Sequence, residues 1–251
     1  MGITSAKVQQ LLYTTMTSMR QLFLIIGMTL ISVLLKAENY PTKFLGIPID
    51  GTKQEMIKKL EEKGFVYDEE TDWLTGEFNG KDVILKIRTN NRKVYYVAVI
   101  YKYFYTGEEV KKEYNILLKQ FENNEQYIPF NLGQEPIPIE EDIDYEIKAN
   151  EKIYSAGFLQ ITHEADSNLV YNDSFKDCTK KVIKLIPSDK LGDETYIHSI
   201  SDKLAYICWH EELKTLYANN LVKVGIEEVS GKYNLIIFYE NGYNKSKGED
   251  L

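Results

Sequence analysis

Histidines and carboxylates are the side chains that most often carry catalysis, and this chain arranges few of them in a productive pattern. Its three histidines, His163, His198 and His210, form no H-x-x-x-H or H-E-x-x-H pattern that would place two imidazoles on one helix face. His163 and His210 are each followed by Glu, but adjacent side chains diverge on a helix and on a strand alike. We therefore expect no metal site.

The two cysteines, Cys178 and Cys208, allow more than one interpretation. A Cys208 nucleophile with His210 as its base needs a strand or turn to aim both at one cleft, because on a helix they lie about 200° apart. In an oxidising compartment Cys178 and Cys208 can instead form one disulfide. The alternative is two separate buried thiols, and the sequence alone does not decide between them.

Sequence motifs for nucleotide binding and serine hydrolysis are absent. The chain contains no G-x-G-x-x-G, no P-loop and no G-x-S-x-G. Its 30 Lys and Arg against 38 Asp and Glu give a formal charge of −8, which argues against electrostatic binding of phosphate backbones. We expect no cofactor and no nucleic-acid partner. The sequence favours a binding protein over an enzyme without settling the choice.

The N-terminus predicts export. An apolar run at residues 22–35 follows Arg20, and as a helix it would span about 21 Å, short of the roughly 30 Å hydrocarbon layer. This length is typical of a signal peptide, and Ala37 offers a small residue for cleavage. Residues 1–37 are therefore predicted to be a signal peptide, with Met16 or Met19 as a possible true start; a core helix is the alternative. The mature protein is expected to be periplasmic or secreted, without a transmembrane span.

With 251 residues, 43% of them hydrophobic, the chain can bury one or two cores. Residues 40–125 predict a unit of helix, three strands and helix. Two capping boxes, Thr52-x-x-Glu55 and Thr106-x-x-Glu109, mark the helix starts. Three β-rich runs lie between them at 72–78, 81–89 and 93–104, separated by Asn79-Gly80 and residues 90–92. This order predicts an antiparallel meander flanked by helices.

The rest of the chain predicts a linker and a second unit. Residues 126–150 are rich in Pro, Glu and Asp, which predicts an acidic loop or linker. Residues 151–251 predict a second α+β unit with a strand at 153–161, helices at 174–186 and 201–217, and a hairpin at 221–240 that turns at Ser230-Gly231. On the second helix, Cys208, Trp209, Leu213 and Leu216 share the expected packing face. The predicted fold class is α+β, and whether the two units fold separately stays open.

The first predicted sheet has two unlike faces. A two-residue turn at Asn79-Gly80 fixes the register so that Leu74 faces Leu85. Continued alternation then places apolar side chains of all three strands on one face, the expected core: Leu74, Phe78, Val83, Leu85, Ile87, Val94, Tyr96, Ala98 and Ile100. The other face mixes aromatic, aliphatic and charged groups, which is typical of an interface.

That second face carries the candidate binding residues. Tyr, Trp and Arg dominate binding hot spots, because they combine a large rigid area with a polar group. The candidates, with a neighbouring lysine, are Trp73, Lys86, Arg88, Tyr95, Tyr101 and Tyr103. Two alternatives stay open: the C-terminal half can pack on this face and bury it, and a three-residue second turn would flip the third strand.

Two segments carry a resemblance to known proteins. Residues 44–51 (FLGIPIDG), before a helix and an Asn-Gly meander, and the ending at 239–244 (YENGYN) and 248–251 (GEDL) resemble uncharacterised secreted proteins of gut anaerobic bacteria. The element order over residues 43–121 is also similar to the β-lactamase-inhibitor-protein-like fold, which small outer-membrane assembly lipoproteins share. That resemblance implies an α+β fold whose members bind proteins on an open sheet face. It implies no catalytic residue, and the chain lacks the cysteine of a lipoprotein anchor.

Two binding functions follow as hypotheses. The first is an exported, non-enzymatic protein that engages a protein partner through the aromatic-rich sheet face. The second is an envelope protein that holds a small ligand such as a glycan by stacking on aromatic rings. An enzyme of unrecognised type is the further alternative, and the oligomeric state cannot be predicted.

Overall fold

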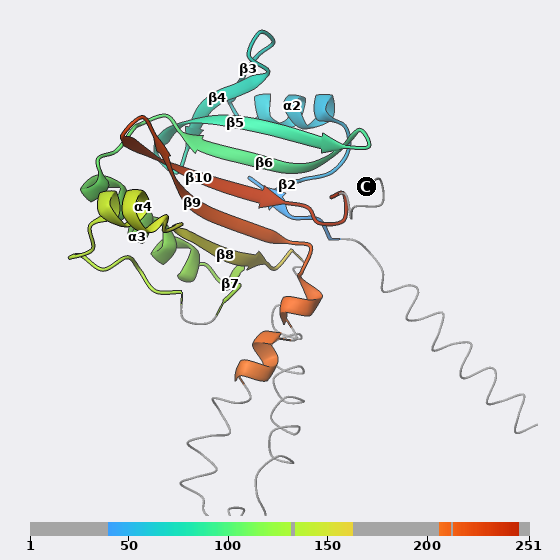
Figure 1. Ribbon diagram of the computed structural model, residues 1–251. Coiled ribbons are helices and arrows are strands. Elements are labelled where there is room, and N and C mark those ends of the chain that lie inside the picture. Colours follow the sequence, from blue (N-terminus) through green and yellow to red (C-terminus); the bar gives the residue numbers. More distant parts are fainter. Residues whose placement is uncertain (1–39, 132–133, 163–205, 212, 246–251) are drawn as a thin grey trace, which may run out of the picture. The chain divides into compact units, whose positions relative to one another are not determined.

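The computed structural model describes residues 40–131, 134–162, 206–211 and 213–245 (Figure 1). The chain divides into two units, residues 1–40 and 41–251, and all the elements named below belong to the second. The predicted signal peptide, the predicted helix at 174–186 and Cys178 lie outside the described residues. Within the described ranges, no helix combines the length and apolarity needed to cross a membrane.

The described part of the chain forms an antiparallel sheet of eight strands, which confirms the α+β prediction. Its strand order is β3-β4-β5-β6-β10-β9-β8-β7. The strands are β3 (Val66–Asp68), β4 (Trp73–Phe78), β5 (Lys81–Asn90), β6 (Lys93–Tyr101), β7 (Tyr127–Pro129), β8 (Ser155–Gln160), β9 (Leu221–Val229) and β10 (Lys232–Glu240). A separate short hairpin pairs β1 (Lys43–Phe44) with β2 (Ile47–Pro48).

Three helices pack on one face of this sheet: α2 (Lys53–Glu61), α3 (Gly107–Glu122) and α4 (Ile143–Asn150). Both predicted capping boxes are present, because Thr52 and Thr106 each accept a backbone N–H at the third helical residue while Glu55 and Glu109 accept the N–H of the cap. The apolar stripes of α2 and α3 and the inward side chains of the strands form one continuous core.

Three tight turns set the strand registers. Asn79-Gly80, Asn91-Arg92 and Ser230-Gly231 all have positive φ at both positions, as the two-residue turns that suit twisted strands require. Leu74 accordingly pairs with Leu85, which confirms the predicted register of the first hairpin. Alternation in the last hairpin predicts one core face formed by Val222, Val224, Ile226, Leu235, Ile237 and Tyr239, and the observed pairing of Leu235 with Ile226 confirms it.

A β-bulge in β6 overturns part of the predicted face assignment. Arg88 pairs with Tyr96, but the next residue, Thr89, pairs with Val94, so Tyr95 is an extra residue on β6. Because side chains alternate with a period of two, one extra residue moves everything beyond it to the opposite face. The second turn contains two residues, and the bulge alone causes the flip.

The flip exchanges the two rows of side chains on β6. Tyr101, predicted on the binding face, is 2% exposed and lies in the core with Val97 and Val99. Conversely, Tyr96, Ala98 and Ile100 leave the predicted core face. These predictions were wrong because a bulge leaves no local signal where two tyrosines, Tyr95 and Tyr96, stand side by side.

The two halves of the chain share the sheet through β6 and β10. These strands pair antiparallel, with Ala98 opposite Phe238. On each side of this junction a helix precedes four antiparallel strands: α2 precedes β3 to β6, and α3 precedes β7 to β10. The second set differs by the insertion of α4 between β7 and β8.

The segment predicted as an acidic linker, residues 126–150, contains β7 and α4 instead. The buried Lys111 on α3 orders the approach to α4, since its Nζ donates to the carbonyls of Ile139 (2.5 Å) and Glu141 (2.9 Å). Asp142 then caps α4 by accepting the Tyr145 N–H (3.1 Å). The acidic residues lie around this anchored frame, so charge density alone did not indicate a flexible connection.

A C-terminal helical segment, residues 206–211 and 213–216, packs on the other face of the sheet. Trp209 and Leu213 are buried there against Ile128 and Leu159, as the predicted packing face required. Leu216, predicted on the same face, is 58% exposed, because the segment ends in a turn that buries Tyr217 instead.

The bulge predicts opposite behaviour for two tyrosines that simple alternation would treat alike. Tyr101→Ala should lower the free energy of unfolding by about 3 to 5 kcal/mol, because it empties a large core position. Tyr103→Ala should cost only the edge-on contact with Tyr105, about 0.5 to 1.5 kcal/mol. Urea denaturation of both variants measures the difference, and equal losses would mean that β6 has no bulge.

Candidate functional site

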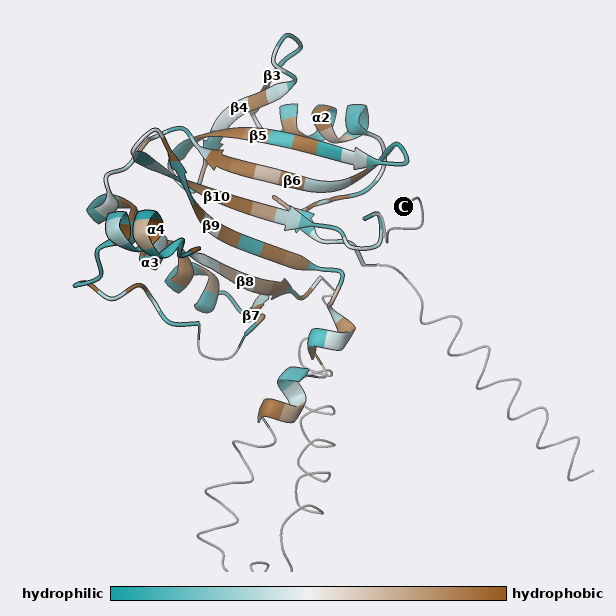
Figure 2. Ribbon diagram, in the orientation of Figure 1, coloured by the Kyte–Doolittle hydropathy of each residue, from teal (hydrophilic) through white to brown (hydrophobic). Residues whose placement is uncertain are grey.

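The first candidate site is the sheet face opposite α2, α3 and α4, which we call the open sheet face. It is formed by outward side chains of β4, β5, β6 and β10: Trp73, Thr75, Ile84, Lys86, Arg88, Tyr96, Ala98, Ile100, Ile236 and Phe238. Ala98 and Ile236 at its centre are buried, whereas Trp73, Tyr96 and Phe238 are half-buried. Among the described residues, the C-terminal helical segment packs on this side through a cluster over β7, β8 and the start of β9. Hydrophobic residues run along β6, β10 and β9 (Figure 2).

Three of the six candidate residues lie on the open sheet face. Lys86 Nζ lies 4.3 Å from the centroid of the Trp73 ring, a cation–π contact between neighbouring strands. Both side chains are half-buried, whereas Arg88 is exposed two residues further along β5. The contact holds the Trp73 ring in place, so part of the conformational entropy cost of binding is met before a partner arrives.

The other three candidates lie elsewhere. Tyr101 is in the core, and Tyr103 follows the end of β6, where it is 59% exposed. Tyr95 is the bulged residue, half-buried, with its ring edge-on to Tyr96 at 4.8 Å. Tyr96 and Phe238 lie on this surface on neighbouring strands, with ring centroids 6.0 Å apart. Neither was among the candidates chosen from the sequence.

Charged groups border the apolar centre of the open sheet face. At one end of β5 lie Lys86 and Arg88, and the outward side of β10 ends in Glu240. Glu240 pairs with Lys223 (3.0 Å) and Lys245 (3.1 Å). Burial alone would raise the pKa of Glu240, but the two ammonium groups outweigh it and lower that pKa. Glu240 is therefore paired with two lysines, and Lys86 and Arg88 bring two further positive charges to this face from β5.

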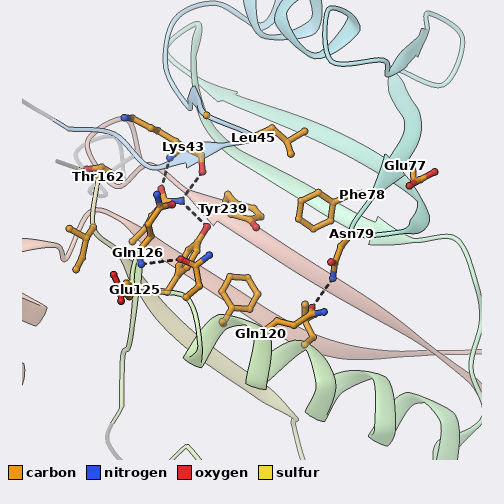
Figure 3. Close-up of a pocket in the computed structure, with 17 residues that line it drawn as sticks. Lys43, Leu45, Glu77, Phe78, Asn79, Gln120, Glu125, Gln126, Thr162 and Tyr239 are labelled. Carbon is orange, nitrogen blue, oxygen red and sulfur yellow. Dashed lines mark hydrogen bonds between the residues drawn. The ribbon is translucent and has the colours of Figure 1, made fainter. Parts of the chain in front are cut away.

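The second candidate site, the helix-side groove, lies on the other face of the sheet between the β1–β2 hairpin and α3 (Figure 3). Its volume is about 990 Å³, at the upper end of the range for small-molecule sites. Five parts of the chain line it: the β1–β2 hairpin, the β4–β5 turn, the end of α3 with the loop after it, residues 160–162, and Tyr239 of β10.

One end of the helix-side groove is a hydrogen-bond network around Gln160. The Lys43 N–H donates to Gln160 Oε1 (2.6 Å), and Gln160 Nε2 donates to the Lys43 carbonyl (3.0 Å) and the Tyr127 hydroxyl (2.9 Å). The Tyr239 hydroxyl lies beside that of Tyr127. Burial raises the pKa of both tyrosines, so both hydroxyls stay protonated at neutral pH.

The other end of the helix-side groove is an amide pair. Asn79 Nδ2 donates to Gln120 Oε1 (2.8 Å), and the Asn79 side chain lies beside the Tyr101 hydroxyl. Between the two ends lie the rings of Phe78 and Phe121. These rings are fixed by aromatic neighbours, since Phe78 lies 5.3 Å from Phe44 and Phe121 lies 4.8 Å from Tyr127.

The histidine and cysteine of the described region lie outside both candidate sites. His210 is buried, and its Nε2 lies 2.6 Å from the Pro129 carbonyl. Cys208 carries a free, half-buried thiol. Its expected partner Cys178 lies outside the described residues, so the disulfide stays a prediction. Within the described ranges, no three His, Cys, Asp or Glu side chains gather as metal ligands would.

Comparisons with models of known families, with curated proteins and with solved structures found no match to this chain.

The buried tyrosine of the helix-side groove predicts a pH dependence. An unfolded tyrosine ionises near pH 10, and burial raises the pKa of Tyr239 well above that value in the folded protein. Above pH 10 the unfolded state therefore binds fewer protons, so stability falls by up to about 1.4 kcal/mol per pH unit for this one group. Tyr239→Phe should make the fall between pH 10 and 11.5 less steep by that amount, measured by urea unfolding. Parallel curves would contradict the burial of this hydroxyl.

Proposed function

We propose that this protein is an exported, non-enzymatic binding protein that engages a protein partner through the open sheet face. One observation carries the proposal: an apolar centre that includes Trp73, Tyr96 and Phe238 lies on the sheet face opposite the helices. A sheet that is solvated on one side normally presents polar side chains there. Aromatic and aliphatic side chains on that side are the composition of an interface centre.

In such an interface a large central side chain supplies most of the binding energy, and charged side chains at the border orient the partner. Trp73 under Lys86 offers a large rigid ring with a charge above it, which is the type of residue that dominates binding energy. Arg88 continues the positive end. We propose a partner whose surface has an apolar centre with carboxylates beside it, because opposite charges at the rim speed association and fix the orientation.

We also propose that the sheet belongs to the β-lactamase-inhibitor-protein-like type. The order of one helix followed by four antiparallel strands, present twice and joined through β6 and β10, supports this assignment. Members of that fold bind proteins on the open sheet face, in agreement with the proposed surface. Export rests on the predicted signal peptide at residues 1–37, which N-terminal sequencing of the mature protein tests.

Site-specific photocrosslinking tests the proposed partner surface. A photoreactive phenylalanine analogue replaces Ile84, in the middle of the open sheet face, and separately Ile116, an exposed residue of α3. In the secreted fraction of the source organism, we expect a discrete adduct from position 84 and none from position 116. Trp73→Ala should then weaken the affinity of the purified pair about 30-fold, as loss of a hot spot of roughly 2 kcal/mol requires.

The charged residue Arg88 provides a second test of the same surface, through the rates of association and dissociation. Arg88→Glu should slow association more than it speeds dissociation, and the effect should shrink at high salt. Each variant is first checked to unfold like the wild type. An adduct from position 116 alone, or an affinity that Trp73→Ala leaves unchanged, would place the partner elsewhere.

A further inference from the structure

We infer that the helix-side groove is a binding site for a neutral oligosaccharide. This inference goes beyond the proposed protein partner, because the groove lies on the helix side of the sheet and is not lined by Trp73, Tyr96 or Phe238 of the open sheet face. Its hydrogen-bonding groups, its apolar surfaces and the placement of its charges all suit such a ligand.

Both ends of the groove keep hydrogen-bonding capacity for a ligand. The Tyr127 hydroxyl accepts from Gln160 Nε2, and its own proton can be donated to a ligand. At the other end, Gln120 uses its oxygen to accept from Asn79, so Gln120 Nε2 and Asn79 Oδ1 keep no partner among the described residues. A donor at one end and a donor with an acceptor at the other suit the hydroxyls of a sugar chain.

Apolar surfaces lie between these polar ends. Phe78 lines the middle of the groove, and Leu45 lies at its mouth, 38% exposed (Figure 3). Leu45 has φ +51°, a left-handed conformation that a leucine adopts only at a cost and that glycine adopts freely. This φ belongs to the two-residue turn Leu45-Gly46 between β1 and β2, and the turn presents the apolar side chain of Leu45 at the mouth of the groove. The C–H face of a sugar ring can lie against such surfaces.

The charges of the groove favour an uncharged ligand. Lys43, Glu77 and Glu125 are its charged lining residues, and their side chains lie at the periphery around the central Phe78 and Tyr239 (Figure 3). A phosphate or a uronic acid would require basic groups that converge on it. A peptide would gain most by adding a strand, but the nearby edge strand β7 has three residues and ends in Pro129, which has no N–H to donate.

Calorimetric titration of the full-length chain tests the inference. The probes are four neutral hexasaccharides: cellohexaose, xylohexaose, mannohexaose and chitohexaose. Hexagalacturonate, a charged sugar of the same length, is the control for charge, and an uncharged hexapeptide is the control for ligand class. We expect at least one neutral hexasaccharide to bind, and hexagalacturonate and the hexapeptide to bind at least tenfold more weakly. Binding of none of the four neutral sugars would overturn the proposal, as would preferential binding of the peptide.

Variants locate the bound sugar in the groove. Tyr127→Phe and Gln120→Ala should each weaken its binding about 3- to 10-fold, the range for loss of one hydrogen bond. Leu45→Gly is the sharpest variant, because it relieves the strained backbone and should raise the denaturation midpoint while weakening the sugar at least 3-fold. Lys119→Ala, beside Gln120 on α3 but outside the lining, is the matched control and should leave affinity within twofold. An unchanged affinity in all three groove variants would overturn the site.

Discussion

The pairing of β6 with β10 is the constraint on which the rest of the structure depends. Without it, each helix would face a separate four-stranded sheet with an exposed edge, and the core that runs from α2 to α3 would be divided. The bulge at Tyr95 decides which side chains of β6 enter that core beside those of β10. Val99 thus lies inward opposite Ile237, while Ala98 lies outward opposite Phe238.

Both candidate surfaces are consequences of this central pair. On β10, Phe238 and Tyr239 are adjacent, so strand alternation sends one ring to the open sheet face and the other to the floor of the helix-side groove. Neither site lies on a long loop, and the ladder of eight strands holds both rings. A site on such a rigid frame needs little ordering when a ligand binds, which favours recognition over large movement.

Local signals in the sequence predicted the local structure. They did not predict which distant segments of the chain lie together. Thr52, Thr106 and Asn79-Gly80 act within four residues of themselves, so their helix starts and turn were predictable. The bulge at Tyr95 was not, because either tyrosine fits either face. The β6–β10 pairing and the groove were not predictable either, since they join segments that lie far apart in the chain and the sequence carries no record of which strands meet.

The edges of the sheet support recognition through its faces. The edge strands β3 and β7 have three residues each, and β7 ends in Pro129, so neither offers the long row of free N–H and C=O groups that strand addition requires. A partner that approaches the sheet therefore gains more from side chains than from backbone pairing. Side-chain recognition depends on which residues alternate outward, and the single extra residue at Tyr95 set that choice for β6. Deletion of Tyr95 would still allow Val94 to pair with Thr89 and Tyr96 with Arg88, so it should leave the open sheet face and the core as they are.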